Sequence, residues 1–334
     1  MMGLFLYLSQ LKENKITWYA VDSATGDLAR QGDIATPGEP GVQGTSPDRK
    51  ILYVAMRSTG ALCSFRIDPH SGRLDLLHAL DTGLADPGYM ATDRTGRYLI
   101  TPYYESACVT VYAIDDDGVA REPLVSRLDT APHAHGIAVS ADNRHVFVPH
   151  TCPGNAVWQL VFDRGQLRTN ATPRVDFDRA IGPRHLHLHP ANGCAYSVNE
   201  QDNSATAYRF AAETGTLTPF QTLPTVPEDH QGGACARMEI HPSGHFLYAA
   251  NRGHDSLAGF RIGADGALAA IGHFATEANP RSFHFDPAGR FLYAAGESSD
   301  KLVSYHIADD GALAPLRRWD TGRVPWWVQV VEPG

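Results

Sequence analysis

HPSGHFLYAANRG (241–253) holds the pattern that decides the fold. A Pro/Gly turn leads into an apolar run centred on one tyrosine, and a polar loop follows. The same pattern recurs in KILYVAM (50–56) and in FDPAGRFLYAAGES (285–298). The central position of the run is occupied, repeat by repeat, by Tyr7, Tyr53, Ile100, Phe147, Tyr196, Tyr248 and Tyr293. The steps between these positions are 46, 47, 47, 49, 52 and 45 residues.

A repeat of 40–50 residues that holds several short strands is typical of a β-propeller. Residues 237–271 read as four strands separated by turns, and period-2 alternation, as in LVSYHI (302–307), supports this interpretation. Seven copies predict an all-β, seven-bladed β-propeller, and the unbroken repeat predicts a single domain over residues 1–334.

The first repeat begins at the second-strand position, whereas VPWWVQVV (324–331) has the pattern of an inner strand. We therefore expect the C-terminal segment to supply the innermost strand of the first blade, which would pair an otherwise open edge. The pair Trp326-Trp327 fits either the packing of this closing strand or a wall of the channel.

The composition of the chain argues against nucleic-acid binding and against a membrane span, and it indicates the compartment. The net charge is −9 and no basic run occurs, which argues against a nucleic-acid surface. No stretch approaches the 18 apolar residues of a membrane span, and the short run Gly3–Leu8 lacks the flanks of a signal peptide. The five cysteines are scattered and never form CxxC, which indicates a reduced, cytoplasmic protein. We expect a monomer or a weak homodimer.

Inner strands line the channel of a propeller, so repeats that differ at inner-strand positions indicate the site. One such position reads Gly41, Gly88, His135, Arg184, Ala236 and Arg281. The position three residues later reads Gly44, Ala91, Ala138, His187, Glu239 and His284. The top of the second strand reads Leu11, Arg57, Tyr104, Thr151, Glu200, Arg252 and Glu297. We expect the polar members of the later repeats to gather near the axis: His135, Arg184, His187, Glu200, Glu239, Arg252, Arg281 and His284.

Two interpretations of this set remain open. Buried charges are costly unless they are paired, so the set could be a network of ion pairs between blades, with Arg184 bound to Glu200 and Arg252 bound to Glu239. Alternatively it forms an anion pocket, in which arginines grip a phosphate or carboxylate while an imidazole or carboxylate moves a proton.

The histidines raise the question of a metal. HLHLH (185–189) places His185, His187 and His189 on one strand face, and PHAH places His133 and His135 on another. Two histidines at i and i+2 could bind zinc with a third ligand. No cysteine and no Asp/Glu triad accompanies this spacing, so we favour a polar channel lining and expect neither a metal nor a cofactor.

Three segments carry a resemblance to a known family. GPRHLHLHP (182–190) followed by YSVNE (196–200), the segment ARMEIHPSGHFLYAANRGHDSLAGFRI (236–262) and APHAHG (131–136) resemble the bacterial propeller-type 6-phosphogluconolactonase family. The same superfamily contains the fungal-type 3-carboxy-cis,cis-muconate cyclase. RSTGAL (57–62) and YYESAC (103–108) lack the Asn-rich loop that is usual in the family, which leaves the substrate open.

The resemblance implies a lactonase whose active site contains His135, Arg184, Glu200 and Arg252. His135 or Glu200 would act as general base, and Arg184 would stabilise the oxyanion. A small anionic lactone, expected to be 6-phosphogluconolactone, would be bound by the remaining polar residues: Arg252, Arg281, Glu239, His187, His284 and Arg57. The alternatives are a lactonizing cyclase, a calcium-dependent gluconolactonase-like propeller, which would need an axial cluster of Glu, Asn and Asp, and a binding propeller without catalysis.

Overall fold

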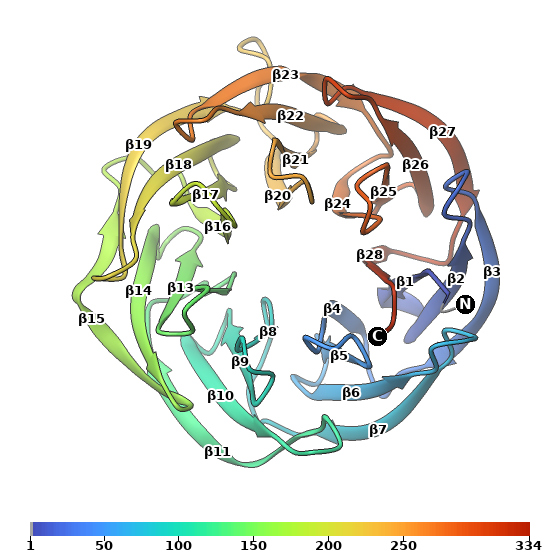
Figure 1. The fold of residues 1–334 in the computed structure, drawn as a ribbon, viewed down its shortest axis with the longest axis horizontal. Coiled ribbons are helices and arrows are strands. Elements are labelled where there is room, and N and C mark those ends of the chain that lie inside the picture. The colour runs from blue at the N-terminus through green and yellow to red at the C-terminus, as the bar shows by residue number, and fades with distance from the viewer. Residues whose placement is uncertain (1–2) are drawn as a thin grey trace.

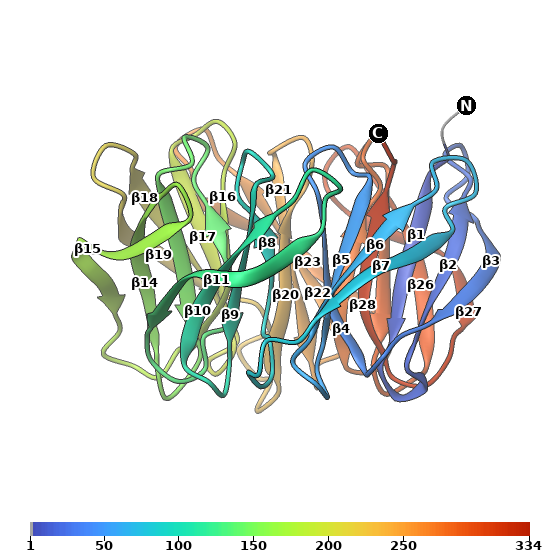
Figure 2. The ribbon, with the colours of Figure 1, turned by 90° about the horizontal axis from the view of Figure 1, so that it is seen from below.

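Residues 3–334 are described by a computed structural model, and they form seven four-stranded sheets around one axis (Figure 1). The predicted seven-bladed β-propeller is confirmed. Blade 1 has the strand order β28-β1-β2-β3, so the C-terminal strand lies innermost beside the first strand of the chain, as predicted. Blades 2 to 7 each take four consecutive strands, from β4–β7 to β24–β27. Figure 2 shows the ring from the side.

Every blade runs from the axis to the rim in the same way. The innermost strands are β28 (Pro325–Val331), β4 (Pro40–Thr45), β8 (Ala91–Thr92), β12 (Ala138–Val139), β16 (Pro183–Leu188), β20 (Ala234–Ile240) and β24 (Pro280–Phe285). The second strands are β1 (Phe5–Gln10), β5 (Ile51–Met56), β9 (Tyr98–Tyr103), β13 (His145–His150), β17 (Cys194–Asn199), β21 (Phe246–Arg252) and β25 (Phe291–Gly296).

The outer half of each blade is a hairpin. Its first strands are β2 (Lys15–Val21), β6 (Leu62–Ile67), β10 (Cys108–Ile114), β14 (Ala156–Asp163), β18 (Ser204–Ala211), β22 (Ser256–Ile262) and β26 (Lys301–Ile307). The rim strands are β3 (Leu28–Ala35), β7 (Leu74–Leu80), β11 (Ala120–Asp129), β15 (Gln166–Asp176), β19 (Thr216–Pro224), β23 (Leu268–Ala275) and β27 (Leu313–Asp320). One short 3-10 helix, η1 (Leu11–Glu13), follows β1, and within residues 3–334 no helix is long and apolar enough to cross a membrane.

In five of the seven blades the repeated tyrosine links its blade to the next by a hydrogen bond. Tyr7 on β1 donates its hydroxyl hydrogen to the carbonyl of Gly72 in the outer hairpin of blade 2, at 2.8 Å. The corresponding tyrosines 53, 196, 248 and 293 bind the carbonyls of glycines 118, 266, 311 and 26, at 2.6–3.0 Å. The last of these bonds joins blade 7 back to blade 1. Ile100 and Phe147 hold the same position in blades 3 and 4 and pack without such a bond.

The core lies between the blades. One cluster combines Phe5 and Tyr7 of blade 1 with Val54 and Phe65 of blade 2, and equivalent clusters recur around the ring. Each blade therefore buries its apolar faces against its neighbours, as expected for a repeat architecture. The polar positions of the inner strands are left to face the axis.

Candidate active site

The channel is lined in three layers, because the pairing of inner and second strands is interrupted at the same height in all seven blades. Register shifts occur in β4, β16, β20, β24 and β28, and in blades 3 and 4 only single bridges precede the short strands β8 and β12. Such bulges turn side chains away from the regular alternation and are frequent beside active sites. They allow consecutive residues to face the axis.

We name the layers by register. The upper layer contains Gly41, Gly88, His135, Arg184, Ala236, Arg281 and Trp326. The middle layer follows one residue later with Val42, Tyr89, Gly136, His185, Arg237, Ser282 and Trp327. The lower layer lies three residues beyond the upper one, at Gly44, Ala91, Ala138, His187, Glu239, His284 and Gln329. Three residues of a strand span about 10 Å, so the upper and lower layers are well separated.

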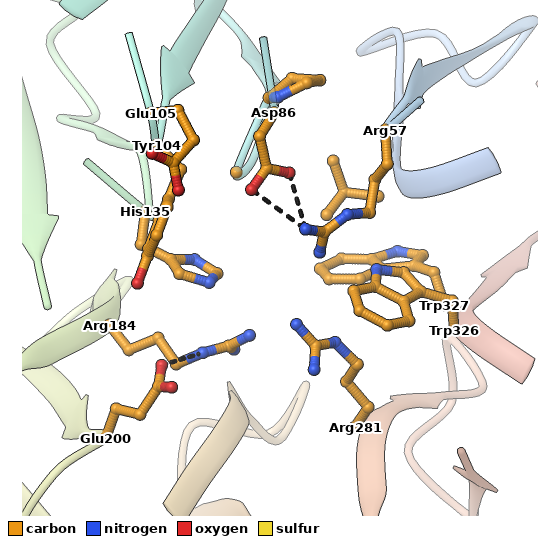
Figure 3. Close-up of a pocket in the computed structure, with 13 residues that line it drawn as sticks. Arg57, Asp86, Tyr104, Glu105, His135, Arg184, Glu200, Arg281, Trp326 and Trp327 are labelled. Atoms are coloured by element: carbon orange, nitrogen blue, oxygen red, sulfur yellow. Dashed lines mark hydrogen bonds and ion pairs between the residues drawn. The ribbon is translucent and has the colours of Figure 1, made fainter. Parts of the chain in front are cut away.

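The upper layer opens into a cavity of about 260 Å³, which we name the upper pocket. Figure 3 shows the guanidinium groups of Arg57, Arg184 and Arg281 and the imidazole of His135 pointing toward a common centre. Gly88 leaves room for the neighbouring inner strand. A Cβ at this position would lie 3.0 Å from the carbonyl oxygen of Ala134 and so press against the backbone that carries His135. The remaining walls are formed by Val42, Asp86, Pro87, Gly88, Tyr104, Glu105, Glu200, Trp326 and Trp327.

Ion pairs hold the arginines in place. Glu200 accepts contacts from two of them, Arg184 Nε at 2.8 Å and Arg252 Nη2 at 2.9 Å. The predicted pair of Arg184 with Glu200 is confirmed, whereas Arg252 lies behind Glu200 and pairs with it rather than with Glu239. Arg57 binds Asp86 at 2.9 Å.

Arg281 has the weakest pairing, since its Nη1 lies 3.3 Å from Glu297. The guanidinium carbon of Arg281 lies 3.5 Å from the centre of the Trp326 ring, and that of Arg57 lies 4.6 Å from it, so one indole supports both cations. The two arginines therefore meet over a rigid aromatic surface and can present their free N–H groups to the same ligand.

Burial and the arginines set the protonation states. Burial, reinforced by Arg184 and Arg281, lowers the pKa of His135 well below its usual value, so this imidazole is neutral at neutral pH. Burial opposes ionisation of Glu200, but Arg184 and Arg252 outweigh it and hold the pKa of that carboxyl below its usual value. Burial and the neighbouring Arg184 and Arg252 also lower the pKa of Arg281, against the opposing effect of Glu297.

The middle layer closes the floor of the upper pocket. The rings of Tyr89, His185 and Trp327 meet at edge or tilted angles, with centroids 5.2–6.1 Å apart. Arg184 donates from Nη1 to His185 Nε2 at 3.1 Å, which orients its guanidinium from below while Glu200 holds it from the side. Arg237 of the same layer has its guanidinium carbon 4.1 Å from the centre of the Trp327 ring and also lines the cavity below.

The predicted site residues do not form one cluster. The structure brings together Arg57, His135, Arg184, Glu200 and Arg281, with Arg252 behind them. The other three line a separate cavity below the middle layer: His187, Glu239 and His284. The expectation of a single axial cluster was wrong because a shift of three residues along a strand moves a side chain past the aromatic floor.

The HLHLH histidines separate for the same reason. His185 lies in the middle layer and His187 in the lower layer, whereas His189 Nε2 lies 2.9 Å from the carbonyl oxygen of Gly244 at the end of the blade. His133 stacks on the ring of Tyr104 with centroids 4.1 Å apart, at the rim of the upper pocket.

Sequence reasoning missed several pocket residues. Trp326 occupies the seventh, C-terminal copy of the upper-layer position, so an alignment extended to the closing strand would have included it. Arg237 lies one residue after that position in its own repeat, where the bulge turns it inward. Asp86 comes from the loop before β8 and carries no repeat signal. Trp326 and Trp327 both pack in the closing strand and line the channel, so the two alternatives hold together.

Comparisons with known proteins agree with the seven-bladed fold. Residues 5–330 match the protein family described as "Lactonase, 7-bladed beta-propeller". The chain is 33% identical over 315 residues to a 6-phosphogluconolactonase of Pectobacterium carotovorum, covering 92% of this chain and 93% of that protein. A 6-phosphogluconolactonase of Yersinia pestis is 31% identical over 287 residues, which cover 84% of each chain. The solved structure of a periplasmic gluconolactonase of Pseudomonas aeruginosa superimposes with a TM-score of 0.90 at 25% identity, over 99% of this chain and 100% of the other.

Proposed function

Because the chain belongs to the seven-bladed β-propeller lactonase family, we propose that its upper pocket hydrolyses the δ-lactone of a phosphorylated sugar acid, with 6-phosphogluconolactone as the substrate. The relatives named 6-phosphogluconolactonase support this substrate, and the charge of the pocket supports it independently. We further propose that the enzyme acts in the cytoplasm, in keeping with its five free cysteines.

The observation that carries the proposal is the convergence of guanidinium groups in the upper pocket. The side chains of Arg57, Arg184 and Arg281 point toward one centre (Figure 3). Guanidinium groups at this spacing match the oxygens of a phosphate well. A lactone without a phosphate would leave the three groups with no anion between them.

In the proposed reaction, water attacks the lactone carbonyl carbon while the neutral His135 takes one of its protons. Arg184 donates hydrogen bonds to the carbonyl oxygen as it becomes an oxyanion, and its orientation by Glu200 and His185 is set before substrate arrives. The tetrahedral intermediate collapses with cleavage of the bond to the ring oxygen. The protonated His135 then returns its proton to that oxygen, which leaves a hydroxyl group and a carboxylic acid. The acid releases the second proton of the attacking water to solvent and becomes a carboxylate.

The protonation states favour His135 over Glu200 as the base. Glu200 is held ionised by two arginines, so accepting a proton would break both ion pairs. His135 is already neutral and carries no such penalty, and its buried Nδ1 has no hydrogen-bond partner among the described residues. Glu200 instead positions Arg184.

Substrate binding is expected to raise the pKa of His135. In the free protein the pKa lies well below the usual value because of burial and the nearby arginines. A bound phosphate offsets the arginine charge and stabilises the protonated form, so the group becomes a stronger base when the site is filled. Titration of the His135 imidazole by NMR, with and without 6-phosphogluconate, measures the change. An unchanged or lowered pKa in the complex would contradict an anion bound beside His135.

Arg281→Met is expected to raise KM for 6-phosphogluconolactone about 10–100-fold, because a charged hydrogen bond contributes about 1.5–3 kcal/mol. Burial and the neighbouring arginines lower the pKa of Arg281, so a bound anion would stabilise its charged form. KM for unphosphorylated gluconolactone should change little. Initial rates with both lactones, corrected for spontaneous hydrolysis, test this. Arg317→Met, at an exposed arginine of the rim strand β27, is the matched control. Equal losses with both lactones would remove Arg281 from phosphate binding.

A further inference from the structure

A second cavity lies on the channel below the aromatic floor, and nothing in the proposed lactonase reaction uses it. This lower pocket has a volume of about 390 Å³ and shares no lining residue with the upper pocket. Its walls include the polar lower-layer residues His187, Glu239, His284 and Gln329, together with Gln43. Polar side chains from five blades thus converge on a space that the sequence pattern had assigned to the substrate.

The lower pocket contains a buried acceptor that lacks a partner. Gln43 is 2% exposed, and its Oε1 has no hydrogen-bond partner among the described residues. Its Nε2 donates to Ser9 Oγ at 2.8 Å, which holds the amide in place. An unsatisfied buried amide carbonyl costs about 1–3 kcal/mol, so a ligand that donates a hydrogen bond here would recover that energy.

Two further groups are fixed and available. Glu239 binds Arg237 through Oε1, at 2.6 and 2.7 Å, while Oε2 lies 3.9 Å from His187 Nε2, beyond hydrogen-bond distance. His284 Nδ1 accepts from the backbone N–H of Val330 at 3.2 Å, which places the imidazole proton on Nε2 as a donor. Burial and Arg237 lower the pKa of His284 to about 4, so this ring is neutral at neutral pH.

The charges disfavour ionic ligands. Four of the five N–H groups of Arg237 are engaged, since Nε and Nη2 bind Glu239 and Nη1 binds Ser282 and the carbonyl of Val328. Arg94, the other cation on the wall, is held by donation from Nε and Nη2 to the backbone carbonyls of Ser140 and Val139. An anion would have to lie beside the ionised Glu239 and the amide oxygen of Gln43, which both repel it. Hydroxyl groups, which both donate and accept, match acceptors on Gln43 and Glu239 beside a donor on His284.

We propose that the lower pocket binds the hydroxylated chain of an uncharged polyol or sugar, at a site distinct from the lactonase pocket. Adjacent hydroxyls donate to Gln43 Oε1 and Glu239 Oε2, and one of them accepts from His284 Nε2. The site includes no residue of the proposed lactonase reaction, so a test of polyol binding does not depend on whether the lactonase proposal is correct.

NMR of the full-length protein with D-glucitol as the probe tests the site. The imidazole signals of His187 and His284 are expected to shift in a saturable manner while the signal of His135 stays in place. Gluconate, which adds a carboxylate to the same chain, should bind at least tenfold more weakly. Saturable binding of gluconate without binding of glucitol would overturn the proposal, as would the absence of saturation with both.

Two variants locate the binding. Ala91→Leu fills the lower layer without touching the polar groups, and Gln43→Leu removes the unpartnered acceptor. Each is expected to raise the dissociation constant of glucitol at least tenfold, with thermal midpoints compared to confirm folding. Ala314→Leu, at an exposed position of β27, is the matched control and should bind as the wild type does. Unchanged binding in both Ala91→Leu and Gln43→Leu would place the ligand elsewhere and reject the lower pocket.

Discussion

His135→Asn is expected to lower kcat for 6-phosphogluconolactone hydrolysis by about 10²–10⁴-fold, the usual contribution of a general base. Asparagine preserves a polar side chain but cannot take a proton from water. KM should change less, because the phosphate is held by arginines rather than by the imidazole. Stopped assays of acid release, with the spontaneous rate subtracted, measure both constants.

Glu200→Gln separates the base from the residue that positions the arginines. This variant keeps the shape of the side chain and weakens its hold on Arg184 and Arg252. We expect a loss of activity while the acid limb of the pH profile is retained, because that limb reports protonation of His135. The limb should move to lower pH, since the variant removes a negative charge and leaves the arginines that already lower the pKa of His135. His70→Asn, at an exposed histidine in the outer hairpin of blade 2, is the control for His135→Asn. Full activity in His135→Asn together with loss of the acid limb in Glu200→Gln would reverse the two roles.

Removal of residues 325–334 is expected to abolish cooperative folding. Five of the lost side chains are buried in the closing strand: Trp326, Trp327, Val328, Val330 and Val331. Burial of side chains of this size contributes about 1.5–3 kcal/mol each, so their sum rivals the 5–15 kcal/mol by which domains are stable. The truncation also exposes the inner edge of β1, which pairs with β28 along its length.

Circular dichroism during thermal unfolding and size-exclusion chromatography measure the outcome of this truncation. Removal of only Pro333 and Gly334, which follow the last residue of β28, is the control and should leave the unfolding transition in place. A ten-residue truncation that kept a cooperative transition near that of the intact chain would show that six complete blades suffice for stability.

The seven-bladed ring could be predicted from the sequence because the residues that form each blade are close together in the chain and recur in every repeat. Each tyrosine position, each turn glycine and each apolar run reports on one blade, and the period of 45–52 residues reports on their number. The hydrogen bond from Tyr7 to Gly72 explains why both residue types recur: one blade donates and the next accepts. The upper-layer residues His135 and Arg184 could be found by the same comparison, since they break a pattern that other repeats keep.

The height of each side chain along the channel could not be predicted in this way. A difference of one residue in register decides whether a group such as Arg237 or His185 lies in the floor or above it, and the bulges that set this register depend on pairing between strands. The sequence also could not show that one carboxylate has two ion-pair partners, as Glu200 has in Arg184 and Arg252. Asp86 joins the pocket from a loop, where no periodicity marks it.

The closing strand has a consequence for synthesis on the ribosome. Among the strands, translation delivers β1 first and its inner partner β28 last, so blade 1 has an unpaired edge until residues 325–331 emerge. The same final residues carry Trp326, the surface over which Arg57 and Arg281 meet. A nascent chain can complete blades 2 to 7 in order, yet it has no finished pocket until the ring shuts. Emergence of β28, closure of the ring and formation of the upper pocket therefore coincide in time.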